Sequence, residues 1–162
     1  MPNKIQIVNT IISALVDKRK QAITAANQAH AAAVDDQSVA ETQYDTLAIE
    51  ASYLAEGQSK RVNEYQQAID AFKQLKLALT NGNNRSINLG TLVQLSVLTK
   101  PNDWFFIGPA AGGFQTQIAG KHITVITPDS PMGKALVGKQ QDDDIEVLIG
   151  LKKIDAYVAI TK

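Results

Sequence analysis

Residues 30–44, "HAAAVDDQSVAETQY", interrupt what otherwise reads as one very long helix. Two adjacent aspartates, Asp35 and Asp36, lie in this stretch, and a third acid follows at Glu41. Either Ser38 or Asp36 could cap a second helix, because each offers a side-chain oxygen to unpaired backbone amides. Glu41 stands three residues after Ser38, the spacing of a capping box. The stretch therefore predicts a turn followed by a capped second helix.

Seam residues on both sides of this turn recur at alternating spacings of three and four. A 3.5-residue period held this long favours two packed helices over two isolated amphipathic ones. Only about residues 34–38 lack a seam position, so we expect an antiparallel hairpin with its tip there. The predicted seam positions are Ile5, Val8, Ile12, Leu15, Arg19, Ala22, Ala26, Ala29 and Ala33, then Tyr44, Leu47, Ala51, Leu54, Gln58, Arg61, Tyr65, Ala68, Phe72, Leu75 and Leu79.

Helix-breaking residues divide the chain into two halves. Residues 1–80 contain one proline and one glycine, whereas residues 81–162 contain four prolines and nine glycines, which places a boundary near "TNGNNRS". Short runs rich in β-branched and aromatic residues then predict strands, and "SPMGKALVG" predicts a short helix capped by Ser130 with Pro131 at its first position. The predicted fold class is α+β: an N-terminal antiparallel α-helical coiled-coil hairpin, then a small antiparallel β-sheet domain with a short helix.

Charge is distributed unevenly along the predicted hairpin. The formal net charge is zero, which disfavours non-specific nucleic-acid binding. No lysine or arginine occurs between Gln21 and Ser59, although coiled coils usually mix both signs. The acids of this span are Asp35, Asp36, Glu41, Asp45, Glu50 and Glu56. An acidic tip predicts binding to a divalent cation or a basic pocket, with chance composition as the alternative.

Several classes of function find no support in the residues. There is no cysteine, which excludes disulfides and cysteine-ligated zinc. His30 and His122 have no companion at metal-ligand spacing, and "GPAAGG" lacks the lysine of a phosphate-binding loop. No apolar run approaches the roughly 20 residues that span a membrane, and the polar residues near the N-terminus argue against a signal peptide. We therefore expect a cytoplasmic protein that is not itself an enzyme.

The segment "ITVITPDSPMGKALVGKQQDDDIEV", residues 123–147, resembles the C-terminal signature of the bacterial Gre transcript-cleavage factors (GreA/GreB-like). That signature runs from a strand through an N/D-S-P turn, a short helix, an L-I-G-K stretch and an acidic turn to another strand. "WFFIGPAAGG" and the predicted hairpin are also similar to this family, so the resemblance covers nearly the whole chain. The matching positions are Ser130, Pro131, Lys134, Leu136, Gly138, Lys139 and Asp144.

This resemblance implies a transcription factor whose partner is RNA polymerase. The C-terminal domain would be FKBP-like and dock at the mouth of the secondary channel, and the coiled coil would enter that channel. The docking turn would include Ser130, Pro131 and Lys134. The protein would be an accessory factor with no stably bound cofactor, because any RNA cleavage would be carried out by the polymerase.

The resemblance also assigns a role to the tip acids. Asp35, Asp36 and Glu41 would help to hold a Mg²⁺ shared with the polymerase active site, near the RNA 3′ end, as in two-metal phosphodiester chemistry. The family tip has the form D-L-K-E-N-A-E-Y, however, and alignment on its tyrosine puts Gln37 and Ala40 at the two key acids. This departure favours modulation of elongation or initiation, as by the DksA-like channel binders, over stimulation of transcript cleavage.

Two alternatives come from other classes of protein. One is a coiled-coil scaffold without polymerase binding, and the other is a peptidyl-prolyl isomerase, since the C-terminal domain would be FKBP-like. Arg19, Gln58 and Arg61 in the predicted seam argue against a long dry interface between copies, so a monomer is expected.

Overall fold

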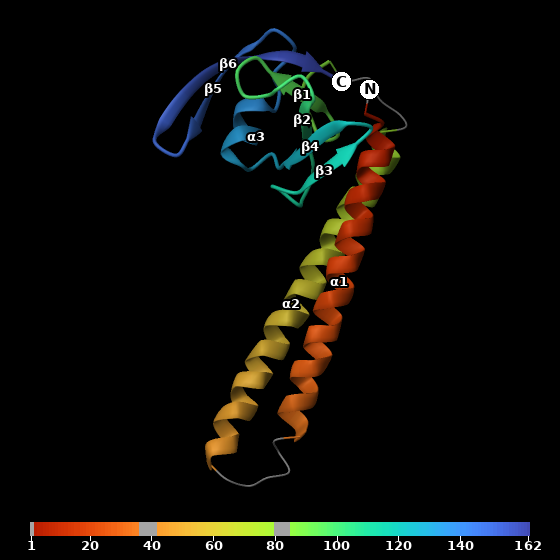
Figure 1. Ribbon diagram of the computed structural model, residues 1–162, viewed down its shortest axis with the longest axis vertical. Coiled ribbons are helices and arrows are strands. Elements are labelled where there is room, and N and C mark those ends of the chain that lie inside the picture. Colours follow the sequence, from red (N-terminus) through yellow and green to blue (C-terminus); the bar gives the residue numbers. More distant parts are fainter. Residues whose placement is uncertain (1, 36–41, 80–84) are drawn as a thin grey trace. The chain divides into compact units, whose positions relative to one another are not determined.

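The computed structural model describes residues 2–35, 42–79 and 85–162, and it describes side chains for 2–33, 48–79 and 85–162 (Figure 1). By its internal contacts the chain forms two compact units. One unit is Ser13–Ile69, and the other joins Met1–Ile12 to Asp70–Lys162. The two long helices, α1 (Lys4–Asp35) and α2 (Thr42–Leu79), each run through both units.

The unit Ser13–Ile69 consists of the two helices packed antiparallel along a seam (Figure 1). From α1 it buries Leu15, Ala22, Ala29 and Ala33, so the predicted α1 seam is confirmed over this stretch. Across the seam, Arg19 Nη1 donates a hydrogen bond to Gln66 Oε1 of α2. With 32 and 38 residues and a rise of about 1.5 Å per residue, the two helices are about 48 and 57 Å long.

The predicted α2 seam is half-buried or buried at most positions whose side chains are described, including Ala68 and Leu75, and it is wrong at Leu54 and Arg61. Ala51, Gln58, Tyr65 and Phe72 are half-buried or buried as predicted. Instead of Leu54 and Arg61, however, the inward positions are those one residue later, Ala55 and Val62, and Ile69 is buried next to the half-buried Ala68. Leu54 is 57% exposed, whereas Ile69 is 1% exposed. In a seven-residue repeat, the second seam position can follow the first by either three or four residues. Only packing against α1 decides between these two spacings.

The other unit begins with the first turns of α1. Asn3 caps this helix, since its side-chain Oδ1 accepts hydrogen bonds from the backbone N–H groups of Ile5 (2.9 Å) and Gln6 (3.3 Å). Val8 is buried as predicted, but Ile7 and Ile11 are fully buried where the seam pattern had Ile5 and Ile12. These turns share a unit with the sheet as well as with α2, so the coiled-coil period alone does not define their buried stripe.

The strands form one six-stranded sheet in the order β3-β4-β2-β1-β6-β5. Their bounds are β1 (Leu92–Leu95), β2 (Asp103–Ile107), β3 (Gln115–Ile118), β4 (Lys121–Ile126), β5 (Asp144–Ile149) and β6 (Lys152–Thr161). The α+β class and the predicted strands are confirmed, but β2 and β4 pair in parallel, from Asp103 opposite His122 to Ile107 opposite Ile126. All the other pairs are antiparallel. β4 lies beside β2 because β3 occupies the outer edge of the sheet. Residue patterns within each strand do not reveal this strand order.

Alternating side chains of the sheet build apolar cores on its two faces. Phe106 is fully buried, and a Cβ added at Gly108 would lie 3.1 Å from Cζ of Phe72, so this face packs closely against α2. The opposite face, with Ile107, packs against the short helix α3 (Pro131–Leu136) through Leu136. In the part of the chain that is described, no helix has an apolar stretch long enough for a membrane span.

A candidate docking groove beside helix α3

Ser130 sets the start of α3, as the sequence predicts. Its Oγ accepts a hydrogen bond from the backbone N–H of Gly133 (3.0 Å) and donates one to the carbonyl oxygen of Thr127 (2.7 Å). Pro131 follows at the first helical position, where its missing N–H would have had no partner within the helix. The Ser130 hydroxyl is therefore used within the turn, which leaves Pro131 and Lys134 as the exposed members of the predicted docking set.

Gly133 allows the close approach that this turn needs. It is buried, and a Cβ at this position would overlap the carbonyl oxygen of Thr127. Only glycine lets the α3 backbone lie this close to the loop that follows β4. The signal for Gly133 in the sequence is its place three residues after the capping serine.

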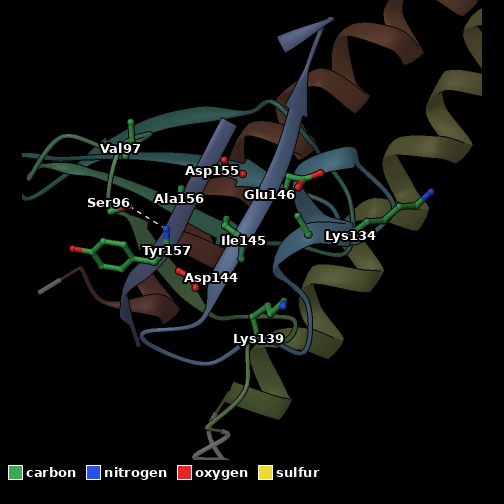
Figure 2. A pocket seen from close by; sticks show the side chains of 11 residues that line it. Ser96, Val97, Lys134, Lys139, Asp144, Ile145, Glu146, Asp155, Ala156 and Tyr157 are labelled. Atoms are coloured by element: carbon green, nitrogen blue, oxygen red, sulfur yellow. Dashed lines mark hydrogen bonds between the residues drawn. The ribbon is translucent and has the colours of Figure 1, made fainter. Parts of the chain in front are cut away.

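An open groove of about 1040 Å³ lies between α3, the β5–β6 hairpin and the loop after β1. Its apolar lining includes Ala135, Ile145 and Ala156, and Figure 2 shows these strands with charged side chains around them. The lining residues are Ser96, Val97, Lys134, Ala135, Lys139, Asp144, Ile145, Glu146, Asp155, Ala156 and Tyr157. Three positions of the matched segment, Lys134, Lys139 and Asp144, are thus brought together at one groove.

The loop that closes one end of the groove is fixed to β6 by two hydrogen bonds. The backbone N–H of Tyr157 donates to Ser96 Oγ (3.0 Å, dashed in Figure 2), and the N–H of Ser96 donates to the Tyr157 carbonyl (3.0 Å). The β1–β6 register shifts between Gln94 and Leu95, just before this loop. The result is an exposed Val97 beside Tyr157, two groove residues that the sequence analysis missed because their pairing is not local.

The charges around the groove are mixed. Lys134 and Lys139 come from α3 and the turn after it, whereas Asp144, Glu146 and Asp155 come from the two strands. Lys153 lies 2.5 Å from Glu146, and this hydrogen-bonded carboxylate raises the pKa of Lys153 above its ordinary value. Both side chains are more than half exposed, so the pair contributes little stability. Among the described residues Lys134 has no ion-pair partner, so its charge is available to a ligand.

The acidic turn before β5 is held by its own hydrogen bonds. Asp143 Oδ2 accepts from the backbone N–H of Gln140 (2.8 Å), and Asp142 has a positive φ of 73°. The backbone of the turn also pairs with Val158 on both sides, since Asp142 N–H donates to the Val158 carbonyl and Val158 N–H donates to the Asp143 carbonyl. Asp143 therefore stabilises the turn, and Asp144 is the acid that lines the groove.

The predicted tip site is only partly within the described chain. Asp35 is the last residue of α1, and its side chain is not described. Asp36, Ser38 and Glu41 lie outside the described residues, so the tip cap and the Mg²⁺ ligands stay predictions. Within the described ranges, no group of three or more His, Asp or Glu side chains could hold a metal ion.

No family model matches the sequence, and no curated protein matches it. Among solved structures, the chain is similar to GreA factor homolog 1 (Gfh1) of Thermus thermophilus, with 16% identity, a TM-score of 0.36, and coverage of 98% of this chain and 94% of that one. A second structure, titled as the transcription factor Gfh1, has 17% identity, a TM-score of 0.37, and coverage of 93% and 92%. Gfh1 of Thermus aquaticus has 18% identity, a TM-score of 0.34, and coverage of 92% of each chain. Similarity at this level does not transfer a function to this chain.

Proposed function

We propose that this protein is a transcription factor that binds RNA polymerase and inserts its coiled coil into the secondary channel to modulate elongation or initiation. It acts as an accessory factor in the cytoplasm, and any RNA cleavage is carried out by the polymerase. One observation carries the proposal: the residues that resemble the Gre signature fold into a capped turn that presents Lys134 at an open groove. The same chain carries a long antiparallel helical hairpin, the second element of that family.

The shape of the helical unit supports insertion into a narrow passage. Its seam is built mainly from alanines beyond Leu15 on α1, and α2 contributes Ala48, Ala51 and Ala55 at half-buried positions. Small seam residues let two helix backbones approach closely, which makes the pair thin. A thin, acidic rod is suited to a passage with basic walls.

The shape of the groove supports docking to a protein. The groove is open and its volume of about 1040 Å³ exceeds what an ion requires, so it has room for side chains of a partner protein. Val97 is exposed as an apolar anchor, and Lys134 supplies a charge that has no ion-pair partner among the described side chains. In this proposal Ser130 shapes the turn, while Pro131 and Lys134 contact the polymerase.

Transcript-cleavage stimulation is the alternative within the same function. It would require Asp35, Asp36 and Glu41 to hold a Mg²⁺ shared with the polymerase, close to the RNA 3′ end. We favour a non-cleaving modulator because Gln37 and Ala40 occupy the positions of the two key acids when the tip is aligned on Tyr44. A scaffold role is less favoured, since the seam Arg19 donates a hydrogen bond to Gln66 within the hairpin.

Binding to core RNA polymerase tests the proposal. We expect Lys134→Glu to lower the affinity at least about tenfold, because it reverses the charge at the groove. Lys152→Glu is the matched control, since it reverses another exposed lysine, which does not line the groove. Equal binding by wild type and Lys134→Glu, or no binding by wild type, would overturn the proposal. RNA cleavage by a backtracked complex, with and without a competing cleavage factor, then separates modulation from stimulation.

A further inference from the structure

Three large apolar side chains are exposed within six residues of α2. Ile49 is 54% exposed, Tyr53 is 70% exposed, and Leu54 is 57% exposed. We call Ile49 and Tyr53 the distal patch, because Leu54 lies about 100° further around the helix than Tyr53 and so faces another side. The coiled-coil period had placed Leu54 in the seam, and the structure instead leaves it at the surface with the other two.

The distal patch is not needed for packing between the two helices. Successive helical residues are about 100° apart, so Ile49 and Tyr53, at i and i+4, lie on one face. The half-buried positions that face α1 are Ala48, Ala51 and Ala55, on the opposite side of the helix. Solvent-facing positions of an amphipathic helix are usually polar, so this concentration of apolar side chains marks a surface for contact.

The charges near the patch define what kind of surface it fits. Glu50 and Glu56 are exposed on the same stretch of α2, and no lysine or arginine occurs between Gln21 and Ser59. A second copy of the chain would bring like charges together, and nucleic acid or an anionic lipid surface would be repelled. The complementary partner is a protein surface with an apolar centre and a rim of lysine or arginine side chains.

The geometry points to the distal patch as a second contact with the polymerase, made with an apolar, basic-rimmed part of the wall of the channel that the arm enters. This inference rests on the proposed function and adds a surface to it that is separate from both the groove and the tip acids. Tyr53 would be the main anchor, because tyrosine combines a large apolar ring with a polar end and is enriched at interface hot spots.

The first test compares the affinities of variants for core RNA polymerase. Because Ile49 and Tyr53 are exposed, replacing both with serine should leave helix content by circular dichroism and the melting temperature close to wild type. We expect this double variant to bind about tenfold more weakly. Leu77→Ser is the matched control, since Leu77 is a 65% exposed leucine of α2 outside Ser13–Ile69. Equal weakening in the control would overturn the inference.

Photo-crosslinking gives a second, independent readout. Replacing Tyr53 with p-benzoylphenylalanine should yield a crosslink to a large polymerase subunit, at a peptide that contains lysine or arginine beside apolar residues. If wild type binds, Lys134→Glu weakens binding, and neither the serine variant nor the crosslink shows an effect, the inference fails while the proposed function stands. If wild type does not bind polymerase, both fail together.

Discussion

The two units of the chain have different buried cores. The helical unit Ser13–Ile69 buries mostly small residues along one line, such as Ala22, Ala29 and Ala33. The unit with the sheet buries large ones on both faces, including Phe106 and Leu136. A single seam of alanines removes little apolar area from water per residue, whereas a two-sided core removes a great deal. The helical unit is therefore thin and suited to extend over a long distance, whereas the unit with the sheet is rigid and suited to present a groove.

The largest expected effect comes from the core of the sheet. Phe106→Ala should lower the free energy of unfolding by about 3–5 kcal/mol, because it leaves a cavity at a fully buried site. Chemical denaturation followed by tryptophan fluorescence measures this, since Trp104 lies on the same strand. Leu151→Ala, at a fully exposed turn residue, is the control and should change the value by less than about 0.5 kcal/mol. A small loss in Phe106→Ala would mean that this face of the sheet is not a tightly packed core.

The next effect tests the seam of α2 directly. Ile69→Ala should cost about 2–5 kcal/mol, because Ile69 is the buried seam residue of the structure. Leu54→Ala should cost less than about 0.5 kcal/mol, because its side chain is at the surface. Thermal melts followed by circular dichroism compare the two variants. If Leu54→Ala lowered stability more than Ile69→Ala, the seam that the sequence pattern predicted would be the correct one.

A smaller effect is expected at the cap of α3. Ser130→Ala removes the acceptor for the Gly133 N–H and the donor to the Thr127 carbonyl, and should cost about 1 kcal/mol. Ser130→Asp keeps an acceptor for the amide and is the matched variant, so it should recover part of the loss. Because the cap positions Lys134, Ser130→Ala should also weaken polymerase binding less than Lys134→Glu does. A larger binding loss in Ser130→Ala would assign the hydroxyl a direct contact.

Of the residues that line the groove, only Lys134 was predicted as a docking residue, and Lys139 and Asp144 were matching positions of the signature. Lys134, Lys139 and Asp144 come from one continuous segment whose order resembles a known signature. Val97 and Tyr157 come from distant segments, and no local pattern relates a loop after β1 to a strand that pairs some 60 residues later. The sequence predicts Ser130 as the cap of α3, but not the second hydrogen bond, which its hydroxyl donates to the Thr127 carbonyl.

The sequence by itself determined the two packed helices, the strands and the cap of α3, and the boundary near residue 80 stays a prediction. These depend on residues close in the chain: seam spacing, segregated glycine and proline, and a serine followed by proline. Tertiary structure decided the α2 seam, the parallel pairing of β2 with β4, the assembly of the groove, and the exposure of Ile49, Tyr53 and Leu54. The physical reason is the same in each case: a local pattern offers more than one set of side chains for burial, and the choice depends on partners distant in the chain.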